Sequence, residues 1–158
     1  MLLNSRNSWS TSNSGALEIG WVAPLRALVH PMVEHSPSYH TVLLIEPDRD
    51  LARITRRALQ DHGFVVTQVA AGEEALAVLG TQYPDAVVLD PDLTDGVGSM
   101  LLDHLHQLEQ REGPSPVWIV ISALDLRDVV RQYGPFIPHF LAKPFDPWDL
   151  VRALEELL

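Results

Sequence analysis

The sequence predicts an α/β fold in which a parallel β-sheet is covered by helices on both faces. Two observations lead to this prediction. Short, unbroken apolar runs alternate with amphipathic stretches, and the alternation repeats five times between Thr41 and the C-terminus. Strands of a parallel sheet are buried on both faces, so they appear as continuous apolar runs. A chain of 158 residues, 46% of them apolar, is long enough for one such domain but hardly for two.

The five predicted strands are rich in aliphatic and aromatic residues, and most of them end next to polar ones. They are TVLLI (41–45), FVVTQV (64–69), DAVVLD (85–90), VWIVIS (117–122) and HFLA (139–142). The absence of a regular polar–apolar alternation within them favours strands that are buried on both faces.

A helix is predicted after each strand. Leu51, Ile54, Ala58 and Leu59 share one face of the first helix, which Gly63 is expected to end. The second helix is predicted over 73–79, and the third is marked by leucines at 101, 102, 105 and 108. The fourth covers 125–133. In the last, Asp146 is a suitable N-cap and Pro147 suits the first helical position; its predicted buried stripe is Leu150, Val151, Leu154, Leu157 and Leu158. Trp118 and Trp148 are expected to fill packing space.

The first forty residues differ in composition from the rest of the chain. Residues 1–15 are rich in Ser and Asn and lack periodicity, which is typical of disorder. We therefore predict a poorly ordered N-terminal extension over 1–40 and a folded domain over 41–158. Met32 is an alternative translation start, since the ordered pattern begins shortly after it.

Composition excludes several classes of function. The net charge of −10 argues against direct nucleic acid or membrane binding, and the cluster Arg53, Arg56 and Arg57 is interpreted as a solvated helix face. The chain contains no cysteine, which rules out disulfides and thiolate chemistry. No apolar run approaches the ~20 residues that span a bilayer, and the N-terminus does not resemble a signal peptide. A cytoplasmic protein is predicted.

Polar side chains gather where the predicted strands end. Glu46 and Asp48 follow the first strand, and Asp90 and Ser122 end the third and fourth; Lys143, the single lysine of the sequence, follows the fifth. The carboxyl ends of parallel strands lie at one edge of the sheet, where open α/β folds place their functional crevice. Three carboxylates there favour a hard cation such as Mg²⁺. A hydroxyl and an ammonium group beside them suit a phosphoryl group, with Asp90 as nucleophile.

The four segments LLIEPD, AVVLDPDLTDGVG, WIVISA and FLAKPF, in this order, resemble the receiver domains of two-component response regulators. The resemblance covers about residues 41–158. It implies a flavodoxin-like (βα)5 fold with strand order 2-1-3-4-5. It also implies that Asp90 accepts a phosphoryl group from a histidine kinase or phosphotransfer protein, and that Mg²⁺ is held near Glu46, Asp48, Asp90 and Asp92. Asp92 matches a position that ligates through its backbone carbonyl.

The resemblance also assigns the remaining site residues. Ser122 matches the switch hydroxyl, Phe140 the switch aromatic and Lys143 the lysine that pairs with the phosphate. Pro144 matches a proline that commonly follows through a cis bond. The sequence departs from the family at Pro47, where a second acidic residue is usual, and at Thr94. The segment GPFIPHF (134–140) replaces the usual small-residue turn.

Alternatives remain open at this stage. A phosphorylation-independent docking module would keep the fold, and Pro47 favours it. DPDLT (90–94) also matches the nucleophile motif of haloacid-dehalogenase phosphatases, and Ser122 and Lys143 fit the next two motifs of that class. However, that class has its nucleophile on the first strand, whereas here two βα units precede Asp90 and no further strand is predicted after Lys143. The EF-hand reading of DPDLTDG fails because Asp95 and Leu101 occupy the required Gly and Glu positions. We therefore predict a signalling domain that is not an enzyme. Its output partner is not identified, and a homodimer is left open.

Overall fold

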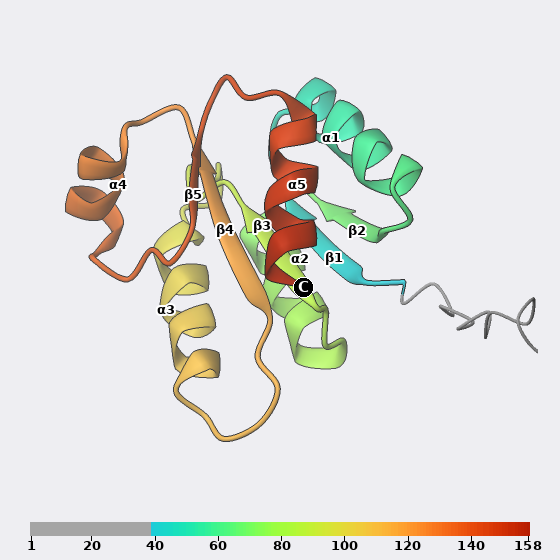
Figure 1. The fold of residues 1–158 in the computed structure, drawn as a ribbon. Coiled ribbons are helices and arrows are strands. Elements are labelled where there is room, and N and C mark those ends of the chain that lie inside the picture. Colours follow the sequence, from blue (N-terminus) through green and yellow to red (C-terminus); the bar gives the residue numbers. More distant parts are fainter. Residues whose placement is uncertain (1–38) are drawn as a thin grey trace, which may run out of the picture. The chain divides into compact units, whose positions relative to one another are not determined.

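The computed structural model describes residues 39–158, and the predicted extension over 1–40 lies outside this range except for Tyr39 and His40. Ten elements alternate strictly between strand and helix (Figure 1). In chain order they are β1 (Thr41–Ile45), α1 (Arg49–Asp61), β2 (Val65–Val69), α2 (Gly72–Thr81), β3 (Ala86–Leu89), α3 (Gly98–Glu109), β4 (Val117–Ser122), α4 (Leu126–Tyr133), β5 (Phe140–Ala142) and α5 (Pro147–Leu157).

The five strands form one parallel sheet of order β2-β1-β3-β4-β5. The predicted flavodoxin-like topology is thereby confirmed. The three central strands are almost entirely buried, as their unbroken apolar sequences indicate.

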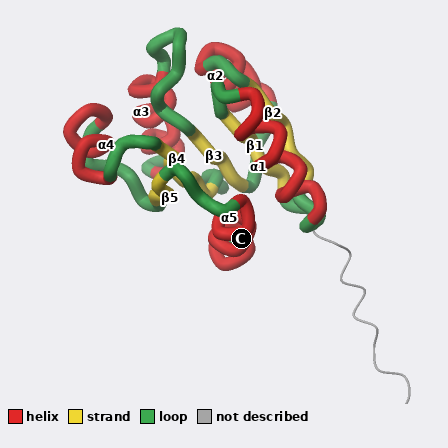
Figure 2. Tube along the Cα trace, turned by 90° about the horizontal axis from the view of Figure 1, so that it is seen from above, coloured by secondary structure: helices red, strands yellow, loops and turns green. Residues whose placement is uncertain are grey.

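Alternate strand residues point to opposite faces of the sheet and enter two separate hydrophobic clusters. Leu43, Val87 and Val120 pack with α2, α3 and α4 on one face. Val42, Val88 and Ile121 pack with α1 and α5 on the other. Figure 2, which looks from above, shows α3 and α5 on opposite sides of the strands. The sheet is therefore the middle of three layers.

Local sequence signals set several helix ends. The carboxylates of Asp48, Asp125 and Asp146 accept hydrogen bonds from the first backbone N–H groups of α1, α4 and α5. Pro147 occupies the first turn of α5, as predicted. Gly63, with φ of 85°, follows the end of α1 in the left-handed region that favours glycine.

Three predicted packing positions are wrong. Ile54 is 48% exposed, because the buried face of α1 runs through Ala52, Thr55 and Leu59, and Ile54 lies roughly 200° around the helix from Ala52. Trp148, expected to fill packing space, is 54% exposed. It contacts His62 edge-on instead. Leu158 follows the last helical residue and is also exposed, so the buried stripe of α5 ends before it.

Candidate functional site

The strand ends place the candidate side chains through the backbone. Each strand ladder continues one residue beyond the strand: the N–H of Glu46 donates to the carbonyl of Val69, and that of Asp90 donates to the carbonyl of Ile45. The N–H of Lys143 donates to the carbonyl of Ser122 over 2.7 Å. The main chain therefore fixes these residues at one edge of the sheet, as the topology predicts.

Lys143 joins the two buried carboxylates. Its Nζ donates a hydrogen bond to Oδ2 of Asp90 over 2.5 Å and lies 2.6 Å from Oε2 of Glu46. The side chains are 15% exposed for Lys143, 9% for Asp90 and 1% for Glu46. The peptide bond from Lys143 to Pro144 is cis, as the family resemblance implies. The site is thus a largely buried triad of two negative charges and one positive charge.

The remaining carboxylate oxygens accept from the main chain. Oε1 of Glu46 accepts from the N–H of Asp48 over 2.9 Å, and Oδ1 of Asp90 accepts from the N–H of Asp92 over 2.8 Å. The same arrangement occurs at the end of β4, where Oγ of Ser122 accepts from the N–H of Leu124. In each case a side chain at a strand end accepts from the residue two positions later. Three of the four carboxylate oxygens thus accept a hydrogen bond, whereas the buried Oε2 of Glu46 has the ammonium of Lys143 nearby but no hydrogen-bond partner.

The charges in the triad influence one another. Burial raises the pKa of Glu46 above its ordinary value, although the Lys143 ammonium and the N–H of Asp48 act in the opposite direction. Burial alone would lower the pKa of Lys143, but its interactions with the two carboxylates outweigh burial and raise the pKa. Lys143 is therefore charged at neutral pH.

Of the four predicted magnesium ligands, Glu46 and Asp90 are brought together by Lys143, and Asp48 turns its side chain elsewhere. Asp48 is exposed, and its Oδ1 caps α1 by accepting from the N–H groups of Asp50 and Leu51 over 2.9 and 3.0 Å. Pro47 supplies no side-chain oxygen. Asp92 is predicted to ligate through its backbone carbonyl, so its exposed side chain does not test that prediction. Among residues 39–158, no cluster of three or more Asp, Glu or His side chains is arranged to hold a metal.

This donor set does not fit Mg²⁺ as arranged. Mg²⁺ requires near-octahedral oxygen coordination at 2.0–2.1 Å. Two carboxylates face each other here, but the ammonium of Lys143 lies between them and contacts one oxygen of each. A cation would have to displace an existing positive charge. The ligand set Glu46, Asp48, Asp90 and Asp92 therefore stays a prediction from the sequence that this arrangement does not match.

Ser122 and Phe140 lie on the same face of the sheet. Ser122 continues the alternation of Trp118 and Val120, whose side chains enter the cluster beneath α3 and α4, and it is 2% exposed. Phe140 packs half-buried against that same cluster and is paired with Val120. The residues that resemble the switch pair are thus neighbours in adjacent strands.

Sequence reasoning missed two residues beside the site. Asp95 caps α2, because its Oδ2 accepts from the N–H of Gly72 over 2.7 Å and from that of Glu73 over 3.1 Å. Burial and the negative charges of Asp92 and Asp90 raise the pKa of Tyr133, which places its phenol within the field of the acidic group. Neither contact has a local signal, since both join segments far apart in the sequence.

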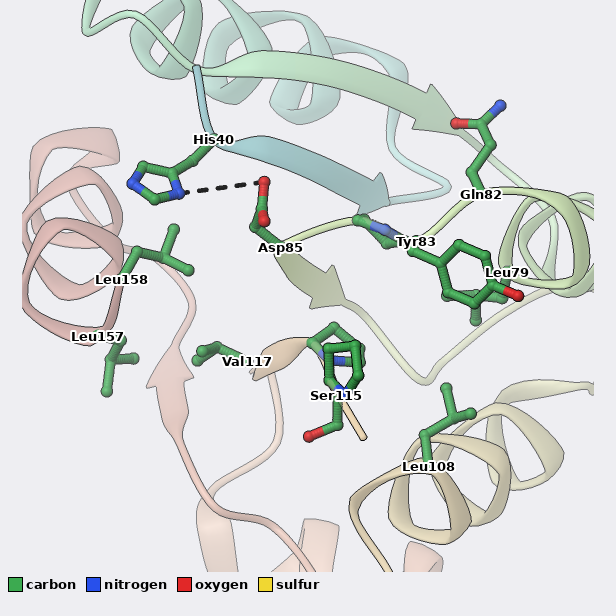
Figure 3. Close-up of a pocket in the computed structure, with 13 residues that line it drawn as sticks. His40, Leu79, Gln82, Tyr83, Asp85, Leu108, Ser115, Val117, Leu157 and Leu158 are labelled. Carbon is green, nitrogen blue, oxygen red and sulfur yellow. Dashed lines mark ion pairs between the residues drawn. The ribbon is translucent and has the colours of Figure 1, made fainter. Parts of the chain in front are cut away.

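A pocket of about 320 Å³ lies at the opposite end of the sheet (Figure 3). It is lined by residues at the starts of strands, such as His40, Asp85 and Val117, together with Tyr83 and Leu158. Nδ1 of His40 lies 4.0 Å from Oδ2 of Asp85. None of the candidate site residues lines this pocket.

Comparison with known proteins gives a consistent result. The family model of the response regulator receiver domain matches residues 42–155. The probable transcriptional regulatory protein TcrX of Mycobacterium tuberculosis is 31% identical over 118 residues, which cover 75% of this chain and 49% of that protein. The DNA-binding transcriptional regulator NtrC of Salmonella typhimurium is 30% identical over 117 residues, covering 74% of this chain and 24% of that protein.

The solved structures show the same domain. A CheY-like response regulator receiver domain from Methylobacillus flagellatus superimposes with a TM-score of 0.64 at 25% identity, over 77% of this chain and all of that one. The chain spans about half or less of the first curated relatives that it matches. Within the described part of the chain, no helix is both long and apolar enough to cross a membrane.

Proposed function

Because this chain belongs to the family of response regulator receiver domains, we propose that it accepts a phosphoryl group on Asp90 and passes the signal on by a change of conformation. Receiver domains are signalling domains and not typical enzymes. The observation that carries the proposal is the buried Asp90 at the end of β3, hydrogen-bonded to the ammonium of Lys143.

The proposed chemistry uses this pair directly. A carboxylate oxygen of Asp90 attacks the phosphorus atom of the donor, and an O–P bond forms while the bond from phosphorus to the leaving group breaks. With a phosphohistidine donor the imidazole keeps the electron pair of the P–N bond and takes a proton from water. Lys143 moves from Asp90 to a phosphoryl oxygen, where a compact ammonium neutralises charge.

The response is carried by Ser122 and Phe140 in this proposal. Ser122 turns its hydroxyl from the N–H of Leu124 toward the phosphoryl group, and Phe140 moves into the space that becomes free. The surface of α4, β5 and α5 changes with them as a shift between two populations. Structures with and without a phosphoryl mimic test this step, and an unchanged Ser122 and Phe140 would contradict it.

Partners and location follow from the same proposal. The donor is a histidine kinase or phosphotransfer protein, the receiver of the signal is a further protein, and the place of action is the cytoplasm. The folded unit is the receiver domain over 41–158. Direct nucleic acid binding is not part of this proposal, because the net charge of the chain is −10.

A second candidate function is a docking module that works without phosphorylation. Two observations favour it: Pro47 occupies the position of the second acidic residue, and both oxygens of Asp90 already accept hydrogen bonds. We do not propose a haloacid-dehalogenase phosphatase, because the sheet has the strand order of a receiver domain and Asp90 follows the third strand.

Acetyl phosphate distinguishes the two candidates. The protein is incubated with this donor, with and without MgCl₂, and its intact mass is measured. A gain of one phosphoryl group that is absent in Asp90→Ala and Asp90→Asn supports phosphorylation of Asp90. No gain in the native chain, together with a gain in Pro47→Asp, assigns the docking role.

A further inference from the structure

We propose that Lys143 takes the place of magnesium in the resting site, so that this domain holds divalent cations much more weakly than a receiver with two acidic residues after β1. The inference deepens the proposed function and rests on it, since it concerns the same site. The weak binding of divalent cations is caused by Pro47, which supplies no carboxylate, and by the position of the Asp48 side chain, which caps α1.

The net charge of the site disfavours a divalent cation. Family members generally bind Mg²⁺ for phosphorylation, and a second acidic residue at position 47 would leave the site with three carboxylates against one lysine. Here only Glu46 and Asp90 face Lys143, so the site has a net charge of about −1. This is half of the net charge of about −2 that a third carboxylate would give. A divalent ion gains less from entering a site whose charge is already nearly balanced.

Each carboxylate oxygen of the site already has a polar neighbour, although Oε2 of Glu46 makes no hydrogen bond. Two of the four carboxylate oxygens face Nζ of Lys143 at 2.5 and 2.6 Å, and the other two accept from backbone N–H groups at 2.8 and 2.9 Å. A metal ion would need at least two of these oxygens. It would therefore expel the ammonium group from an environment where the side chain of Lys143 is only 15% exposed.

Asp48 does not compensate for Pro47. It lies next to the missing ligand position, but its carboxylate already accepts from two N–H groups of the first turn of α1. Turning it into the site would leave these donors to solvent and remove a negative charge from the positive end of the helix. The same residue would have to choose between capping the helix and holding a metal, and its geometry here is that of a cap.

The same contacts control the access of a phosphoryl donor to Asp90. Both oxygens of Asp90 are engaged at rest, and the bond that can be released without disturbing the main chain is the one to Lys143. Lys143 therefore acts as a positioning group: its ammonium covers Oδ2 of Asp90 and favours the ionised form of that carboxylate. Access to Asp90 is governed by the movement of one side chain more than by the concentration of a metal.

Metal affinity is measured directly, without phosphorylation. Mn²⁺ replaces Mg²⁺ as a paramagnetic probe, and its binding to the folded protein is followed by water-proton relaxation, with competition by Mg²⁺. We expect the Pro47→Asp variant to bind Mn²⁺ at least about tenfold more tightly than the native chain, because it restores a carboxylate. Pro114→Asp adds the same charge at the opposite, exposed end of the sheet and serves as the matched control.

Two further variants separate the parts of the argument. Lys143→Gln removes the competing charge and should also tighten Mn²⁺ binding, while Asp48→Asn keeps a helix cap and should leave affinity unchanged. Equal affinity in the native chain and Pro47→Asp would overturn the inference, as would weaker binding in Asp48→Asn or unchanged binding in Lys143→Gln. Circular dichroism confirms that each variant is folded. A native chain that binds Mn²⁺ tightly yet is labelled by acetyl phosphate would refute this inference and leave the proposed function standing.

Discussion

Replacing Lys143 with Met tests whether the triad is a stabilising unit. The substitution keeps the length of the side chain but removes the charge that separates two buried carboxylates. Removing one partner of a buried ion pair costs about 3–5 kcal/mol, since the remaining charge stays uncompensated. Lys143 keeps 15% of its side chain exposed, so the lower end of that range, about 3 kcal/mol, applies here.

Urea unfolding followed by tryptophan fluorescence measures this loss. With an m-value of about 1.5 kcal/mol/M, a loss of about 3 kcal/mol lowers the urea midpoint by about 2 M. Trp118 is buried beneath α3 and reports on the core. The double variant Glu46→Gln with Lys143→Met serves as the control, because it removes one negative charge along with the positive one. It should be more stable than Lys143→Met alone.

The loss should also depend on pH. The pKa of Glu46 is raised by burial, so its protonated form is favoured in the folded state, and the resulting stability is present at low pH and lost as pH rises through the folded pKa. Without Lys143 this effect is stronger. The gap between the native chain and Lys143→Met should therefore shrink as pH falls below neutrality. A loss under about 1 kcal/mol at neutral pH, or a gap that widens on acidification, would refute the reasoning.

Two other substitutions test features of the loops around the site. A Cβ on Gly98 would lie 1.9 Å from the carbonyl oxygen of Pro91, so Gly98→Ala should destabilise the domain by about 3 kcal/mol in urea unfolding. Gly80→Ala, in open space on α2, should instead gain about 0.5–1 kcal/mol, and equal effects would contradict the clash. The pKa of Asp95 is lowered, because its backbone hydrogen bonds outweigh the effect of burial, so its stabilisation is present above the ordinary pKa of 3.8 and lost as pH falls through the folded value. Asp95→Ala should therefore lower the Tm at pH 7 but converge with the native chain in acid, and parallel curves throughout would show that this carboxylate does not act through its charge.

The fold could be predicted from the sequence because its signals are local. Continuous apolar runs marked the strands, and Asp146–Pro147 marked the start of α5. Polar residues at strand ends identified the edge where the site lies. Ile54 and Trp148 could not be placed, because an apolar residue near the boundary of a helix face is buried or exposed according to how the helices pack.

The side-chain contacts at the site could not be predicted from the sequence for a different physical reason. Asp48 is chemically suited both to a helix cap and to a metal, and sequence spacing does not decide between these uses. The hydrogen bonds of Asp95 with the start of α2 join residues more than twenty positions apart. Likewise, the contact of one ammonium with both Glu46 and Asp90 depends on three strands at once. These side-chain contacts are determined by the tertiary structure and not by local sequence.

The repeated contact at the strand ends restricts where proline can stand. The side chains of Glu46, Asp90 and Ser122 each accept from the N–H two residues later, and the residue between takes no part in that bond. Proline lacks an N–H, so it is compatible with the middle position and incompatible with the donor position. Pro47 and Pro91 both occupy middle positions. A proline at position 47 therefore leaves the hydrogen bond of this loop intact, whereas a proline at position 48 would remove its donor.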